Sequence, residues 1–218
     1  MLNQRLRVVL ATLLTGLIIH FVPNRLLVTA ILAVLWALLF FPLRWNELIV
    51  FALAGVFFVG QNYVCLKAGL FEFRFKDVLL MPYYEPLLWG FYFLSMKRFL
   101  STADTTYVFN WKSVAGLAVT SIAFSVFSFD SRALFAATLC STALLFLLFH
   151  TTRDVQHALF ALALGFVVEL FGVSTGLWSY PAPDFLGIPF WFATMWLSVG
   201  LLGYRFLFPA ATWVAASK

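Results

Sequence analysis

Uninterrupted apolar runs are the feature that most limits how this chain can fold. Residues 133–149, for example, contain no charged side chain and no alternation of polar and apolar residues. Only 11% of the 218 residues are charged, whereas a soluble domain carries about a quarter. In lipid, backbone N–H and C=O groups must pair within the protein, which leaves helices or a closed barrel. Because the alternation of a barrel strand is missing, the sequence predicts an all-α, polytopic integral membrane helix bundle.

Eight apolar segments mark the expected helices. They are residues 7–22, 26–41, 47–66, 78–96, 113–129, 133–150, 156–173 and 187–208. Several are shorter than the roughly 20 residues that a perpendicular span needs, so about seven to eight transmembrane helices are expected and six remain possible. The first segment resembles a signal peptide, but no small-residue cleavage site follows it. We therefore interpret it as the first transmembrane helix.

The distribution of Lys and Arg predicts the orientation of the chain. These residues lie at segment ends rather than in a basic stripe, so the net charge of +5 predicts no nucleic-acid partner. With eight spans, the side that holds both termini carries nine of them and the other side carries five. Because positively charged loops stay in the cytoplasm, we expect both termini to be cytoplasmic, in a bacterial inner membrane. Asp104, Asp130 and Asp154 are interpreted as solvated loop charges.

The sequence contains no pattern for a metal or a cofactor. Cys65 and Cys140 are isolated thiols in apolar surroundings, which is typical of packing residues rather than of a disulfide or zinc site. The three histidines lie at segment ends without metal-ligand spacing. There is no phosphate-binding loop, dinucleotide fingerprint or Asp-rich metal motif. We therefore expect neither a cofactor nor a metal.

Residues 69–89 and 176–196 carry nearly the same pattern, 107 positions apart. The identical pairs are Gly69/Gly176, Leu70/Leu177, Asp77/Asp184, Leu79/Leu186, Pro82/Pro189 and Trp89/Trp196. An ungapped match of Gly, Asp, Pro and Trp at an offset close to half the chain length indicates duplication. We expect one membrane domain, residues 1–218, built from two tandem pseudo-symmetric repeats, roughly 1–109 and 110–218. Four spans in each repeat would give both copies the same orientation.

The repeated segments also predict where two helices begin. Asp77 and Asp184 precede proline-containing helices, and an Asp at this position commonly caps a helix start. Pro86 lies one turn further in, where it should distort the helix or mark its true beginning.

Two carboxyl groups fall inside apolar segments. Glu85 lies between Tyr84 and Pro86, and Glu169 lies in the run FVVELFG. A carboxylate at the bilayer centre costs at least about 2.5–3.5 kcal/mol, so we expect both to face the bundle interior. Apolar surroundings favour the neutral carboxyl, which can donate a proton. The alternative is a hydrogen bond that holds helices together. In the repeat, Asn62 corresponds to Glu169, so each copy has a polar residue before the shared loop.

Aromatic residues gather near these carboxyl groups, and their rings attract cations. Such a lining could stabilise a carbocation, although ordinary packing is the alternative for each ring. The candidate catalytic residues are Glu85 and Glu169, and the candidate substrate-binding residues are Asn62, Tyr83, Tyr84, Trp89, Trp178, Trp191 and Trp196.

The pattern G-x-[WF]-x-[YF], followed by a loop, a proline and an aromatic-rich helix, resembles the membrane-bound lycopene cyclase domain of the fused two-repeat type. Residues 82–85, PYYE, match that family's P-x-E-E stretch with only the second Glu retained, and residues 189–192, PFWF, have neither. Residues 169–176 and 187–189 are similar to the related carotenoid hydratase family. The resemblance implies redox-neutral carotenoid biosynthesis by an isomerase or a lyase. A carboxylic acid would protonate a terminal double bond, and the cation would close a ring or capture water.

Three functions remain open from the sequence. The first is an enzyme that protonates a hydrophobic isoprenoid substrate, with Glu85 as the acid and Glu169 as acid or base. The second is a small proton-coupled transporter with a site between the two repeats. The third is a non-catalytic membrane subunit whose intramembrane polar groups serve assembly.

Overall fold

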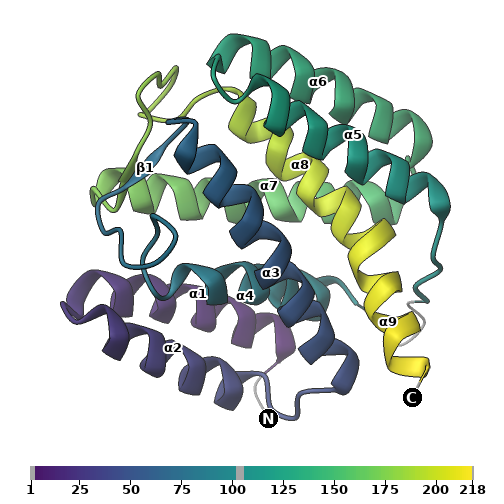
Figure 1. The fold of residues 1–218 in the computed structure, drawn as a ribbon. Helices are drawn as coiled ribbons and strands as arrows, with labels where there is room; N and C mark the ends of the chain where they lie inside the picture. The colour runs from purple at the N-terminus through teal and green to yellow at the C-terminus, as the bar shows by residue number, and fades with distance from the viewer. Residues whose placement is uncertain (1–2, 102–105, 218) are drawn as a thin grey trace.

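The computed structural model describes residues 3–101 and 106–217, and its helices follow the apolar segments (Figure 1). They are α1 (Gln4–Phe21), α2 (Arg25–Leu39), α3 (Trp45–Lys67), α4 (Glu85–Leu100), α5 (Trp111–Phe127), α6 (Ser131–Leu148), α7 (Thr152–Ser174), α8 (Trp191–Leu202), the π-helix η1 (Gly203–Leu207) and α9 (Phe208–Ala216). Two short strands, β1 (Glu72–Phe73) and β2 (Trp178–Ser179), complete the described elements. The predicted fold class, an all-α membrane helix bundle, is confirmed.

Five of these helices are long and apolar enough to cross a membrane. They are α1, α3, α6, α7 and the continuous rod of α8, η1 and α9, whereas α2 and α5 are apolar but shorter. The exact number of crossings stays a prediction. Successive helices run in alternating directions, so that β1 and β2 lie at one end of the bundle and α9 ends at the other (Figure 1).

The helix predicted from residue 78 begins only at Glu85. Leu79 and Leu80 have left-handed φ values of 48° and 63°. Val78 and Met81 exchange two backbone hydrogen bonds of 2.9 Å, so residues 78–81 form a tight turn instead of a helix. Pro86 lies in the first turn of α4, where its missing N–H breaks no helical hydrogen bond. The expectation that Pro86 marks the true helix start is therefore confirmed.

Corresponding elements of the two halves of the chain lie 107 residues apart. The helices α3 and α7 each contain 23 residues and keep this offset at both ends. The turn at residues 185–188 has the same pair of backbone hydrogen bonds as the turn at residues 78–81. The strands β1 and β2 pair antiparallel, and Glu72 lies opposite Ser179, its counterpart at this offset. The loops that follow α3 and α7 therefore lie side by side.

The two repeated aspartates have different partners. Asp184 accepts a hydrogen bond of 2.7 Å from the N–H of Phe190, immediately before α8, as the capping prediction expects. Asp77 instead accepts two bonds of 2.9 and 2.6 Å from Nε of Arg25. The predicted cap is wrong for Asp77, because its carboxylate pairs with Arg25 at the start of α2.

The interpretation of three aspartates as solvated charges is wrong for Asp154 and holds for Asp130, which is exposed. Asp130 accepts hydrogen bonds from the N–H groups of Arg132 and Ala133 and caps α6. Asp154 is 0% exposed, because α7 begins against the rod and brings this carboxylate to Arg205. Asp104 lies outside the described residues.

Two ion pairs join helix ends at the same offset. Arg205 donates from Nε and Nη2 to the two oxygens of Asp154, at 2.5 and 2.6 Å. In the first half of the chain, Arg98 pairs with Glu47, whose side chain is 4% exposed. Each pair connects the start of a long helix, α7 or α3, to the helix that follows its loop. Both pairs lie at the end of the bundle opposite the strands.

Gly200 allows α8 to pack directly against α7. A Cβ atom at this position would lie 2.7 Å from Cα of Ala158, closer than real contacts allow. We expect Gly200→Ala to lower the free energy of unfolding by about 1–3 kcal/mol, because the two backbones must move apart. Thermal unfolding of the purified protein in detergent measures this change. Gly60→Ala in α3 is the matched control, because a Cβ atom there meets nothing within 4 Å. Equal melting temperatures in both variants would contradict the close approach.

Candidate functional site

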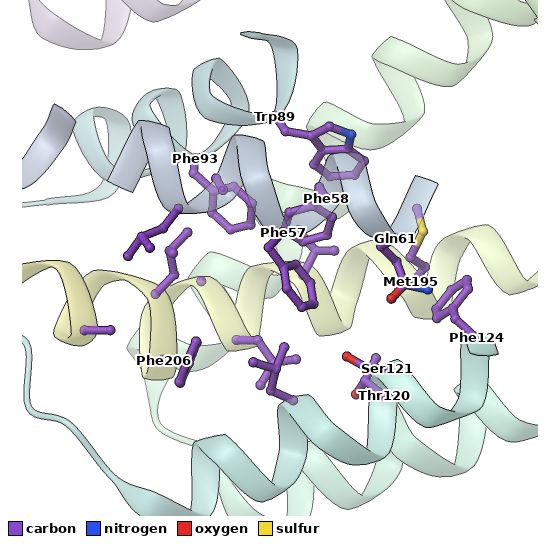
Figure 2. Close-up of a pocket in the computed structure, with 18 of the residues that line it drawn as sticks. Phe57, Phe58, Gln61, Trp89, Phe93, Thr120, Ser121, Phe124, Met195 and Phe206 are labelled. Atoms are coloured by element: carbon purple, nitrogen blue, oxygen red, sulfur yellow. The ribbon is translucent and has the colours of Figure 1, made fainter. Parts of the chain in front are cut away.

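A cavity of about 940 Å³ lies between α3, α4, α5 and the rod of α8, η1 and α9. Figure 2 shows Phe57, Phe58 and Gln61 of α3 on one side, with Thr120, Ser121 and Phe124 of α5 opposite. The lining is mostly aliphatic and aromatic. Trp111 and Trp213 border the cavity and are 78% and 71% exposed, so the cavity opens toward the surroundings of the bundle between α5 and α9.

The π-helix η1 shapes one wall of this cavity. Its wider turn is closed by a hydrogen bond from the N–H of Phe208 to the carbonyl of Gly203. Pro209 has no N–H and could not have bonded the carbonyl of Arg205 as an α-helix requires, which explains why the helix widens here. Gly203, Phe206 and Leu207 of η1 line the cavity. Helical segments of this type are frequent at functional sites.

A smaller space of about 50 Å³ adjoins the cavity, and we call it the acidic chamber. Its lining residues are Asn62, Phe71, Phe73, Glu85, Trp89, Tyr92, Val168, Glu169, Trp178, Tyr180, Trp191, Met195 and Trp196. Five of these also line the large cavity, namely Asn62, Phe71, Trp89, Trp191 and Met195. The two spaces therefore share a wall, and both candidate carboxyl groups lie on the chamber side of it.

Both carboxyl groups are buried and hydrogen-bonded. Glu85, 6% exposed, accepts a bond of 3.1 Å from Nδ2 of Asn62. Glu169, 7% exposed, accepts two bonds of 2.7 Å at one oxygen, from Nε1 of Trp178 and from the hydroxyl of Tyr180. Burial, with the nearby Glu169 carboxyl, raises the pKa of Tyr180 well above its ordinary value. Tyr180 therefore remains a hydrogen-bond donor to this carboxyl group.

Aromatic rings form the shared wall. Trp89 stacks on Phe58 with ring centroids 4.1 Å apart and on Trp196 with centroids 5.5 Å apart. Trp191 packs edge-on against Tyr180, with centroids 5.7 Å apart. Phe58, Trp89 and Trp196 therefore form a stack of three rings that leads from the large cavity to the acidic chamber.

The structure brings together most of the residues singled out from the sequence. Glu85, Glu169, Asn62 and the four tryptophans named above all line the chamber. Two tyrosines do not reach either space. Tyr83 is 40% exposed on the loop, and Tyr84 is buried at the residue that precedes α4. The turn that delays the start of α4 directs both away from the chamber and the cavity.

Sequence reasoning missed several lining residues. Gln61, Cys65 and Phe58 line the cavity with Asn62, and their spacing of i, i+3, i+4 and i+7 identifies one face of α3. That spacing was an available signal. Thr120 and Ser121 carried no such signal, since isolated hydroxyl residues are common in membrane helices. In the described ranges, 3–101 and 106–217, no group of three or more His, Cys, Asp or Glu residues could hold a metal ion.

Comparison with solved structures identifies similar folds. The mycobacterial Insig homolog MvINS from Mycobacterium vanbaalenii superposes with a TM-score of 0.66 and 17% sequence identity, covering 77% of this chain and 94% of that chain. A cross-linked trimer of a cysteine variant of MvINS superposes with a TM-score of 0.65, with the same identity and coverage. No protein-family model matches this chain, and no curated protein matches it.

The resemblance to lycopene cyclase is therefore wrong. The chain shares its fold with Insig homologues, which are a different family of membrane proteins. The superposition establishes the fold, which is that of an integral membrane protein. Because the sequence identity is only 17%, it leaves the chemistry open. Gly69 and Gly176, with which the cyclase-like pattern begins, form turns after α3 and α7, where their φ values are 73° and 68°. A pattern imposed by turn geometry carries no information about a reaction.

Proposed function

We propose that the protein is a non-catalytic membrane protein that binds a long apolar lipid in the cavity between α3, α4, α5 and the α8–α9 rod. The observation that supports this proposal most directly is the cavity of about 940 Å³ with its aliphatic and aromatic lining. An apolar wall favours an apolar ligand, because an alkyl chain packs against it by van der Waals contact without leaving a polar group unpaired. The opening beside Trp111 and Trp213 gives a lipid a route from the bilayer.

The position of the carboxyl groups favours binding over catalysis. An enzyme that protonates a polyene must bring a carboxyl group to within hydrogen-bond reach of the reacting carbon. Glu85 and Glu169 line the acidic chamber but not the large cavity. The chamber, at about 50 Å³, is too small to admit the terminal group of a carotenoid beside them.

We also propose that the chain is a tandem duplication, with repeats of roughly 1–109 and 110–218. The offset of 107 residues between α3 and α7 and between the two ion pairs supports this. The proposed location is a bacterial inner membrane with both termini cytoplasmic. Arg98 and Arg205 lie at the end of the bundle opposite the strands, and positive charge is retained on the cytoplasmic side.

The test is to measure the lipids that copurify with two matched variants. Val114 lines the cavity, whereas Val119, on the same helix, is 41% exposed on the outer face. We expect Val114→Trp to lose most of the copurified lipid, because the indole fills the cavity, and Val119→Trp to retain it. Mass analysis of organic extracts, normalised to protein, gives the comparison. An equal lipid content in Val114→Trp, Val119→Trp and the unaltered protein would refute binding in this cavity.

Acid catalysis is a second candidate, favoured by one observation: two carboxyl groups and stacked aromatic rings meet in the chamber. Incubation of the purified protein with linear polyenes tests it. An isomer of unchanged mass, or a product heavier by one water, that disappears in Glu85→Gln would establish catalysis. Recovery of the unchanged polyene would leave binding as the function.

A further inference from the structure

The size of the acidic chamber limits what it can hold. A water molecule needs about 10–15 Å³ of this kind of volume, so a chamber of about 50 Å³ has room for a few non-hydrogen atoms. A phosphate or sugar headgroup does not fit. A hydroxyl group and the carbon that bears it do fit. Asn62, Trp89 and Trp191 border both spaces, so the chamber lies directly beside the large cavity. A molecule in the cavity would place one end in the chamber by passing between these side chains.

The walls of the chamber present both acceptors and donors. The acceptors are the carboxyl groups of Glu85 and Glu169. The donors include the indole N–H groups of Trp191 and Trp196, residues that are 3% and 2% exposed and line the chamber. In the described part of the chain, these two N–H groups and that of Trp89, which also lines the chamber, are buried without a hydrogen-bond partner. A buried donor without a partner is destabilising, so a ligand that supplies an acceptor is favoured.

Only some ligand groups satisfy both kinds of wall. An ammonium donates but offers nothing to the indoles. A carbonyl or a carboxylate only accepts, so it pairs with the indoles and with a protonated carboxyl group but not with an ionised one. A hydroxyl group both donates and accepts, so it can pair with an indole and with a carboxyl group in either protonation state.

We infer that the acidic chamber binds the hydroxyl end of a long-chain alcohol whose apolar chain fills the large cavity. This inference rests on the proposed function and specifies its ligand class. The hydroxyl donates to the carboxyl group of Glu85 or Glu169 and accepts from the N–H of Trp191 or Trp196. The selectivity of the protein for an alcohol over a hydrocarbon of the same length then resides in the chamber, and the gain from chain burial resides in the cavity.

The experiment compares 1-octadecanol with octadecane as competitors for bound diphenylhexatriene, a fluorescent apolar probe, in detergent. Energy transfer from the tryptophans to the probe reports its displacement, and competitor concentrations are expressed per micelle. We expect the alcohol to compete about tenfold better than the alkane, which is the order expected for satisfying buried hydrogen-bonding groups. Trp191→Phe removes one N–H group. It should reduce the preference for the alcohol severalfold without weakening the competition by octadecane. Trp45→Phe is the matched control, because Trp45 is 51% exposed at the start of α3 and lines neither space; it should leave the preference unchanged.

The outcomes separate the two proposals. Equal displacement by alcohol and alkane in the unaltered protein would overturn the hydroxyl site while supporting lipid binding in the cavity. A preference for the alcohol that Trp191→Phe does not alter would also overturn it, because the hydroxyl would then bind elsewhere. Failure of the probe to bind at all would refute the proposed function itself. If Trp191→Phe does not elute as a single species, Trp196→Phe replaces it, because it removes the second indole N–H of the chamber.

Discussion

Replacement of Arg205 by Met will lower the free energy of unfolding by about 3–5 kcal/mol, because it leaves the carboxylate of Asp154 buried without its cation. Asp154 is 0% exposed and receives two hydrogen bonds from the Arg205 guanidinium. Its remaining partner, Thr151, donates through a backbone N–H and a hydroxyl and supplies no charge. Thermal unfolding in detergent, followed by tryptophan fluorescence, measures the loss.

The double variant Arg205→Met, Asp154→Asn is the control that assigns the cause. The amide of Asn retains an acceptor for Thr151 but carries no charge, so the double variant should recover most of the lost stability. Lys76→Met breaks the exposed pair with Glu72, whose side chains are 49% and 62% exposed, and should have no measurable effect. If the single and double variants were equally unstable, the uncompensated charge would not be the cause.

Truncation of Trp196 to Ala will cost about 3–5 kcal/mol, the range for the removal of a large aromatic side chain from a packed core. Trp196 is 2% exposed. It stacks on Trp89 and contacts Tyr92 edge-on, with centroids 5.5 and 5.7 Å apart. Its ring also covers Gly165, where a Cβ atom would collide with it. Neighbours on two helices therefore lose contacts together.

Trp213→Ala is the matched control for this truncation, because Trp213 lies on the same rod and is 71% exposed. Chemical or thermal unfolding of the two variants under the same detergent conditions gives the comparison. We expect the change in Trp213→Ala to lie within about 0.5 kcal/mol. Comparable losses in both variants would mean that Trp196 is not held in a packed core.

Local rules predicted most helices of this fold but not the turn at residues 78–81, the two short strands or the π-helix. Long apolar runs and the placement of Pro86 predicted the helices, and Asp184 was identified as a helix cap. These rules failed at Asp154, because the burial of its carboxylate depends on the ion pair with Arg205, 51 residues later in the chain. No local pattern states that a charge near a loop will be buried against a distant helix. The number of membrane crossings was equally beyond these rules, since several helices are near the minimum spanning length.

The candidate site, too, could be predicted from the sequence only in part. Glu85 and Glu169 could be singled out because a carboxyl group in an apolar run is costly unless it faces the protein interior. The cavity could not, because an empty volume arises from the packing of several helices and from the widened turn at η1. The family resemblance failed because the matching residues repeat two turns, one at Gly69 and Gly176 and one at the left-handed Leu79 and Leu186, and such turns serve proteins of different chemistry.

The position of the cavity has a consequence for stoichiometry. Thr120, Ser121 and Phe124 line it from α5, whereas the residues 107 positions earlier, Leu13, Leu14 and Leu17, are 58%, 36% and 52% exposed on α1. In the tandem duplication proposed above, the surface equivalent to this cavity wall is therefore exposed on α1, and the proposed lipid site exists in one repeat only. A titration with lipid should saturate at one equivalent per chain, so that two similar halves yield a single, non-cooperative binding isotherm.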